Sequence, residues 1–374
     1  MRGAILFNGN AESEEHLVRA AAPLLLGSRH GDPAISASRR ALLVTAGWAE
    51  HEHDEAHVKR ALNDIGLGSA WDGGFDRALP NLSLLVELNE LLQRAPELGE
   101  SWRELRQAEQ TARRFYLEHN AHLLALFRRT LAEAKALEPE LTVPRLLSRD
   151  GGPGSGARPL ARYALARELR QALRTLEAND DHLFELLGEI ERRAFDSAGV
   201  VYHPGWRAAR ERLEQRILSA SAILLFGGRL DLLLDGLRFF RLREPLAEAL
   251  RRGAQLVAQS AGAMVLCERI IVYDDFAETP RDFQLYDRGL ALVRDMQLFP
   301  HCMERIQTDD RDNLAYLARR FRHHVCVGLN QRSFLLHELW PRRAMSWGAD
   351  DGVYVFGPEG DKRCYRTGEE VPFG

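Results

Sequence analysis

Short apolar runs that stop at a small residue are the feature that most constrains the fold of this chain. Residues 3–8 (GAILFN) end at Gly9, residues 41–46 (ALLVTA) end at another glycine, and residues 221–228 (SAILLFGG) end in two. Runs without polar alternation are typical of strands buried on both faces of a parallel sheet. A helical pattern over residues 53–68 follows the second run. Strands that alternate with helices predict an α/β fold.

A long helical stretch interrupts this pattern. From about residue 82 to 195, Leu, Ala, Glu and Arg recur at helical spacing, broken by a glycine-rich linker at residues 149–159 (RDGGPGSGARP). We expect a packed helical hairpin or bundle with polar outer faces there, and we find no catalytic constellation in it. The prediction is therefore a flavodoxin-like, three-layer, mostly parallel sheet with a large helical insertion. Its parts are residues 1–81, the insertion 82–195, and residues 196–374.

The strand and helix pattern resumes after the insertion. We expect strands at AQLVAQ, DMQLFP and HVCVGLN, a helix at DNLAYLARRF, and a closing hairpin around Gly352 in the tail MSWGADDGVYVFG.

Composition excludes several partners. Net charge is −4, and the 50 basic residues are interleaved with 54 acidic ones, so nothing favours nucleic acid or an anionic membrane. No apolar run reaches the roughly 18 residues of a spanning helix. The first residues have too short an apolar stretch for a secretory signal, so we expect a cytoplasmic protein. The four cysteines lie far apart and predict neither disulfides nor zinc.

One histidine cluster has the spacing of metal ligands, but a solvated helical turn explains it better. His53 and His57 stand four residues apart, as helical metal ligands do, beside His51 and several acids. The His-Glu-x-x-His order is missing and no distant ligand set is identifiable. We expect a solvated first helical turn there, and no metal or cofactor in the protein.

The segment VAQSAGAM carries the sharpest chemical signal. A buried strand runs into Ser260, which Ala261 and Gly262 follow at the start of a helix. A nucleophile elbow needs such small neighbours, because its turn brings strand and helix backbones close together. The turn would lift the serine hydroxyl above the sheet edge and place the Ala261 N–H beside an oxyanion. A serine N-cap in a tight packing turn is the structural alternative.

Two glycines at 227–228 end the preceding strand. Because parallel strands end at one edge, the Gly228 N–H is expected to complete an oxyanion hole with that of Ala261. A simple glycine turn is the alternative.

These segments resemble a known family. LLFGGRLDLLLDGL followed by AQSAGAMVL is similar to the cyanophycinase and aspartyl dipeptidase (dipeptidase E) family of serine peptidases, whose fold is similar to class I glutamine amidotransferase domains. The likeness extends to LFPHCMERIQTDDRDNLAYLARRF and VCVGLNQRSFLL. It covers about residues 1–66 and 221–356, and leaves out the helical insertion.

The resemblance implies roles for individual residues. Ser260 would be the nucleophile and His301 its general base. Two positions are plausible for the third residue: Asp275, beside Asp274, and Gln331, where the family has glutamate. We favour Asp275, because an amide cannot stabilise an imidazolium as a carboxylate does.

Two arginines stand where substrate would enter. Arg229 replaces the family's usual Asn or Asp after the glycines, and with Arg332 it is a candidate for gripping a substrate carboxylate. An ordinary surface pair with Asp231 or Asp235 is the alternative.

The sequence therefore predicts a serine hydrolase that cleaves an amide bond in a small peptide or isopeptide through an acyl-enzyme on Ser260. A different class of function also stays open, namely a non-catalytic binding or regulatory module. The departures from the family at Gln331 and Arg229 argue for it. A third reading places the function in the helical insertion. Glutamine amidotransfer is disfavoured, because Cys267 lies seven residues from the serine. A homodimer stays open.

Overall fold

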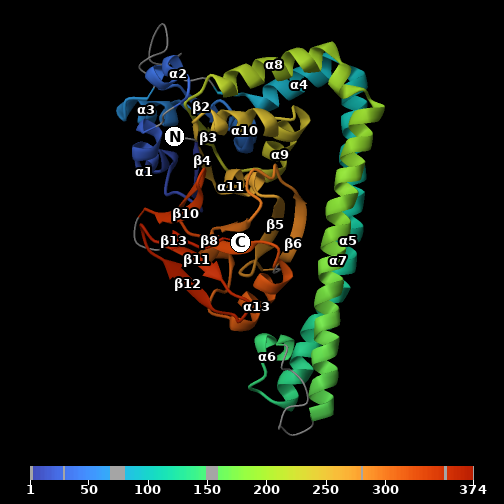
Figure 1. The fold of residues 1–374 in the computed structure, drawn as a ribbon. Helices are drawn as coiled ribbons and strands as arrows, with labels where there is room; N and C mark the ends of the chain where they lie inside the picture. The colour runs from blue at the N-terminus through green and yellow to red at the C-terminus, as the bar shows by residue number, and fades with distance from the viewer. Residues whose placement is uncertain are drawn as a thin grey trace.

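The structure is a computed structural model that describes residues 3–27, 30–67, 81–148, 159–278, 281–348 and 352–373. Figure 1 shows an α/β body with a long pair of helices standing along one side of it. No helix within the described ranges is long and apolar enough to cross a membrane.

The central sheet has parallel strands at its middle. Its seven strands lie in the order β13-β10-β9-β1-β4-β3-β2; β1, β4, β3 and β2 are parallel, and β9 runs antiparallel to β1. All residues of these four parallel strands are buried, as the unbroken apolar runs predict. The bounds are β1 (Ala4–Asn8), β2 (Ala41–Val44), β3 (Ala222–Leu225), β4 (Gln255–Gln259), β9 (Phe334–Leu339), β10 (Arg342–Trp347) and β13 (Glu370–Val371).

Helices cover both faces of this sheet. Leu6, Leu43 and Val257 pack on one face with α1 and α3. Their neighbours Ile5 and Leu42 point to the opposite face, toward α8, α9 and α10. The bounds are α1 (Glu14–Leu26), α2 (Pro33–Ser38), η1 (Ala46–His51), α3 (Ala56–Asp64), α8 (Pro204–Leu218), α9 (Leu230–Phe239), α10 (Arg243–Arg251) and α11 (Ala261–Leu266). The predicted class, a three-layer α/β fold with a parallel centre, is confirmed.

A second sheet lies beside the first. It has the order β12-β11-β8-β7, with β7 and β8 parallel, and a separate pair is formed by β5 and β6. The bounds are β5 (Arg269–Asp274), β6 (Arg281–Arg288), β7 (Met296–Pro300), β8 (Val325–Leu329), β11 (Val353–Phe356), β12 (Lys362–Tyr365), α12 (Cys302–Arg305) and α13 (Arg311–Arg320).

The predicted hairpin around Gly352 is wrong. The strands on either side of it, β10 and β11, belong to different sheets: β10 pairs with β9 and β13, and β11 pairs with β8 and β12. The apolar alternation correctly marked two strands, but it carries no information on which partner each strand takes.

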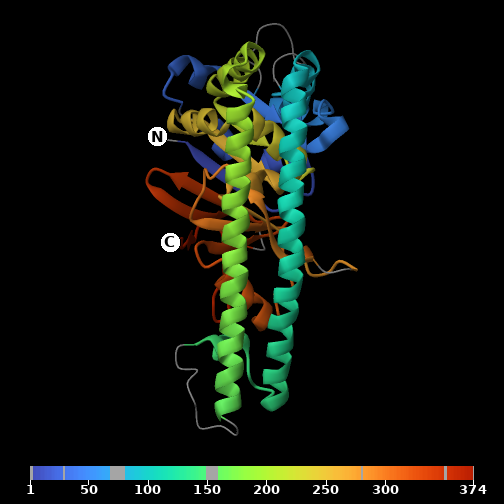
Figure 2. The same cartoon turned by 90° about the vertical axis from the view of Figure 1, so that its right-hand side faces the viewer.

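The helical insertion is a hairpin of two very long helices. α5 (Pro96–Leu137) has 42 residues and α7 (Pro159–Ser197) has 39. At 1.5 Å per residue they are about 63 and 58 Å long, and Figure 2 shows them side by side along the body. α4 (Leu84–Arg94), α6 (Val143–Leu147) and η2 (Val200–Tyr202) complete this region. The predicted linker at 149–159 falls almost wholly outside the described residues.

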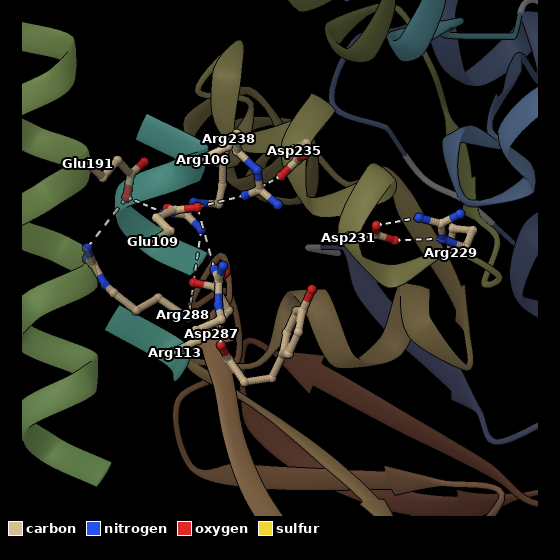
Figure 3. Close-up of polar contacts among 11 residues, drawn as sticks. Arg106, Glu109, Arg113, Glu191, Arg229, Asp231, Asp235, Arg238, Asp287 and Arg288 are labelled. Atoms are coloured by element: carbon tan, nitrogen blue, oxygen red, sulfur yellow. Dashed lines mark hydrogen bonds and ion pairs between the residues drawn. The ribbon is translucent and has the colours of Figure 1, made fainter. Parts of the chain in front are cut away.

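Buried ion pairs join the hairpin to the body. Arg238 of α9 is 9% exposed; its guanidinium bonds to Asp287 of β6 at 2.9 Å, to Glu191 of α7 at 2.8 Å and to Glu109 of α5 at 3.2 Å. Figure 3 shows these groups converging between the two helices and the body. Because each charge has an opposite partner, the interface tolerates the loss of water.

A second buried pair lies further along the hairpin. The guanidinium of Arg320 on α13 is fully buried and donates to both oxygens of Asp180 on α7, at 2.6 and 2.8 Å. The Tyr116 hydroxyl of α5 also donates to Asp180, at 2.6 Å. Both long helices are therefore linked by hydrogen bonds to α13, the helix that follows His301 and α12 in the chain.

We predict that Asp180→Ala lowers the free energy of unfolding by about 3–5 kcal/mol, because it leaves a buried guanidinium without its carboxylate. Urea denaturation followed by circular dichroism measures this. The matched control is Asp181→Ala: that carboxylate is 47% exposed and pairs with Arg269, so its loss should cost about 0–1 kcal/mol. Equal effects in the two variants would show that the buried pair does not hold the hairpin in place.

Candidate active site

The carboxyl end of β1 in the first sheet lies against the carboxyl end of β8 in the second sheet. A Cβ on Gly9, just after β1, would lie 2.3 Å from the carbonyl oxygen of Leu329 at the end of β8. The Asn8 side chain donates to the backbone oxygens of Gln331 at 3.2 Å and Ser333 at 3.0 Å. Residues that follow β4 in one sheet and β7 in the other are therefore brought together.

Ser260 occupies a strained turn between β4 and α11. Its φ is 51° and its ψ is −115°, a conformation that non-glycine residues rarely adopt. Its N–H donates to the Asn8 oxygen at 3.0 Å, which fixes the turn to the end of β1. Strain of this kind persists only where the surroundings over-determine it.

Glycines around Ser260 make the turn possible. A Cβ on Gly227 would lie 2.9 Å from the Ser260 Cβ, and one on Gly262 would lie 2.3 Å from the Leu225 oxygen. Neither distance accommodates a side chain. The small residues on which the elbow prediction rested are therefore required by close backbone packing.

His301 comes from the second sheet. It follows β7 directly, has a left-handed backbone with φ 56° and ψ 34°, and precedes the short helix α12. Its Nε2 lies 2.8 Å from the Ser260 Oγ, and its side chain is 16% exposed. The predicted nucleophile and the predicted base are thus within hydrogen-bonding distance, although their catalytic roles stay predictions.

Glu304 is the residue that contacts the other side of the imidazole. Its Oε2 lies 3.0 Å from the His301 Nδ1. Burial lowers the pKa of His301 below its ordinary value, and the arginine at 305 lowers it further, whereas Glu304 raises it. A neutral imidazole with its Nδ1–H toward Glu304 leaves Nε2 free to accept the serine proton.

Glu304 was not predicted from the sequence, because the family resemblance points to Asp275 and Gln331 for the third residue. A signal existed: positions three apart in one helical turn face each other, and Glu304 stands three residues after His301.

The contacts of Asp275 are with residues other than His301. Its Oδ2 accepts from the Gln307 N–H at 3.0 Å and from the Asn313 side chain at 2.8 Å, and its own N–H donates to the Arg305 oxygen at 2.7 Å. Burial raises its pKa. Asp275 therefore anchors the segment that follows α12, and the structure places Glu304, rather than Asp275, against the His301 ring.

Gln331 makes no described contact with the imidazole, and its backbone oxygen accepts a hydrogen bond from the Asn8 side chain. Its neighbour Asn330 is 5% exposed, and its side-chain oxygen accepts from the Met303 N–H at 2.9 Å. Asn330 thus fixes the first turn of α12, which carries Glu304.

The two predicted oxyanion donors lie on adjoining turns. Gly228 has a φ of 110°, and a Cβ there would lie 2.2 Å from the Gly47 oxygen; one on Gly227 would lie 3.2 Å from the Ala261 nitrogen. Within the described part of the chain, neither the Gly228 N–H nor the Ala261 N–H makes a hydrogen bond. Both are available to an acceptor, and their role stays a prediction.

The two predicted substrate arginines already contact carboxylates. Arg229 donates from Nε to Asp231 at 2.9 Å and from a terminal nitrogen at 2.6 Å, and Figure 3 shows this pair apart from the Arg238 cluster. Arg332 donates to Glu12 at 2.8 Å. Both guanidinium groups are half exposed or more, so a grip on substrate would require exchange of these partners.

The histidine cluster near the amino end is held by its own neighbours. His51 lies 2.8 Å from Asp54, and His57 stacks on Trp48 with ring centroids 5.7 Å apart. In the described ranges no group of three or more His, Cys, Asp or Glu is arranged to hold a metal ion.

A hydroxyl, an imidazole and a carboxylate hydrogen-bonded in series are the constellation of serine hydrolases. Residues 204–338, which contain Ser260, His301 and Glu304, match the model of peptidase family S51. The sequence resemblance to this family is therefore confirmed over these residues, and the match supports a peptidase.

Solved structures include similar chains. One is a peptidase from an acI-B1 actinobacterium, with 12% identity, a TM-score of 0.46, and coverage of 100% of this chain and 98% of that one. Another is a putative peptidase E from Listeria monocytogenes EGD-e, with 14% identity, a TM-score of 0.28, and coverage of 37% and 65%. No curated protein matches the chain.

We predict that Glu304→Gln lowers kcat/KM by about 10- to 100-fold, because a neutral amide no longer stabilises the imidazolium. Activity should rise with pH through the pKa of His301. Since Glu304 raises that pKa, its loss should move this limb of the pH profile to lower pH.

The matched control is Asp309→Asn, a fully exposed carboxylate between α12 and α13 that should leave the profile unchanged. If Asp275→Asn moves the limb and Glu304→Gln does not, Asp275 is the third residue and our assignment is wrong.

Proposed function

We propose that this peptidase cleaves an amide bond in a short peptide or isopeptide through an acyl-enzyme on Ser260. The observation that carries the proposal is the 2.8 Å contact between the Ser260 Oγ and the His301 Nε2, in a segment that matches a peptidase family. The Glu304 carboxylate at 3.0 Å from the His301 Nδ1 supports it.

In the first half-reaction, the Ser260 Oγ attacks the scissile carbonyl while its proton passes to the His301 Nε2. The carbonyl oxygen becomes negatively charged, and the Ala261 and Gly228 N–H groups stabilise it. When the C–N bond breaks, His301 returns the proton to the leaving amine. Ser260 is then an ester of the acyl group.

Water reverses these roles in the second half-reaction. His301 takes a proton from water, the resulting hydroxide attacks the ester carbonyl, and the proton returns to the Ser260 Oγ as the carboxylic acid leaves. Throughout, Glu304 holds the Nδ1–H and stabilises the imidazolium. The depressed pKa of His301 keeps the imidazole neutral, and therefore basic, near pH 7.

For the substrate, the resemblance implies an acidic residue next to the scissile bond. Arg229, which follows the predicted oxyanion turn, is the side chain best placed in the sequence to meet such a carboxylate. Its present partner Asp231 occupies the bidentate geometry that a substrate carboxylate would use. The substrate is therefore expected to compete with Asp231.

A fluorophosphonate probe tests the nucleophile. We expect one probe molecule to attach to Ser260 of the wild-type protein. The Ser260→Ala variant should lose all labelling and should no longer hydrolyse short acidic peptides. The matched control is Ser219→Ala, at a partly exposed serine that follows α8, and this variant should label normally.

Intact mass spectrometry reads the labelling, and amine release reads the hydrolysis. A wild-type protein that stays unlabelled and binds peptides without cleaving them would instead be a non-catalytic binding module.

A further inference from the structure

A large cavity lies between the far end of the helical hairpin and the α/β body. Its volume is about 1030 Å³, and its walls come from α7, the end of α6, α13, β8, β11 and the segment near residue 372. This volume is ample for a small molecule, whose binding sites commonly measure about 300–1,000 Å³.

The cavity is distinct from the candidate active site. Its lining includes Val325 and Cys326, at the amino end of β8. The residues near His301, Asn330 among them, follow the carboxyl end of the same strand. Five residues of strand separate Val325 from Asn330, which is about 16 Å.

Positive charge dominates the lining. Four arginines contribute to it, Arg170 and Arg174 from α7 and Arg319 and Arg322 from α13 and its end, against a single carboxylate, Glu177. This excess stands out in a chain whose net charge is −4.

Two of these arginines, Arg170 and Arg174, form no ion pair with a carboxylate in the described part of the chain. Arg322 pairs with Glu177 at 3.0 Å, and Arg319 pairs at 2.8 Å with a glutamate outside the lining, Glu359. Arg170 donates only to the backbone oxygens of Leu146 and Ser148 among its described contacts.

Arg174 makes no hydrogen bond or ion pair to any residue that the structure describes. Guanidinium groups bind carboxylates and phosphates bidentately, so these two arginines have donors left for an anion.

The remaining wall is apolar. Leu173 of α7, Val355 and Phe356 of β11, and Phe373 line the cavity together with two prolines. An inorganic ion would leave this surface in contact with water, whereas a ring or aliphatic chain would cover it.

We propose that this cavity binds a small organic anion, with carboxylate or phosphate groups at the arginines of α7 and an apolar ring or chain against Phe356 and Phe373. The proposal does not depend on the chemistry at Ser260, since the ligand occupies the opposite end of β8.

Isothermal titration calorimetry on the full chain tests the proposal with two probes that share a phenyl ring, phenylsuccinate and phenyl phosphate. We expect saturable one-to-one binding of at least one of them, and the stronger binder shows whether carboxylate or phosphate is preferred. Uncharged phenylsuccinamide should not bind. Arg170→Ala/Arg174→Ala should weaken binding at least about tenfold, which corresponds to the loss of one charge-assisted hydrogen bond.

Arg167→Ala is the matched control, because Arg167 is an exposed residue of α7 outside the cavity lining and its loss should leave affinity unchanged. Circular dichroism checks that the variants are folded. The proposal is overturned if neither probe binds up to about 10 mM, or if the double variant binds as the wild type does. It is also overturned if labelling Ser260 with a fluorophosphonate abolishes binding, since the probe would then occupy the active site.

Discussion

The close approach of three strand ends determines the geometry of the candidate site. Ser260 keeps its unfavourable backbone conformation because its N–H is bonded to Asn8 and because Gly227 and Gly262 let neighbouring backbones come within contact distance. A side chain at either glycine would push the turn away from its neighbours. The position of the Ser260 hydroxyl is thus a consequence of packing in the centre of the parallel sheet.

The second sheet supplies the imidazole, so the site depends equally on how the two sheets are joined. Asn8 bonds to the segment after β8, and Asn330 in that segment bonds to the start of α12. The His301 turn is therefore fixed to the same strand end that fixes Ser260. The long helical hairpin braces this body from outside, through the buried guanidinium groups of Arg238 and Arg320.

The sequence predicted the parts of this arrangement that depend on local pattern. Apolar runs marked the four parallel strands, and small residues marked the Ser260 turn. Strand partners were not predictable in this way: β10 and β11 were read as one hairpin, but they lie in different sheets. The residue that contacts the other side of the imidazole, Glu304, was not predicted for a related reason. Whether a carboxylate reaches an imidazole depends on side-chain contacts, and the Asp275 carboxylate accepts hydrogen bonds from the backbone of Gln307 and the amide of Asn313 instead. Glu304 reaches the ring because a single helical turn brings it there.

We propose that the Ser260 hydroxyl, the His301 imidazole and two backbone N–H groups converge on one reacting carbonyl. A crystal structure of the protein after reaction with a fluorophosphonate measures this directly. We predict phosphorus bonded to the Ser260 Oγ and a phosphonyl oxygen within about 3.1 Å of both the Ala261 and the Gly228 nitrogens, with the His301 Nε2 close to the ester oxygen. A phosphonate on another residue, or a phosphonyl oxygen turned away from both nitrogens, would contradict the account.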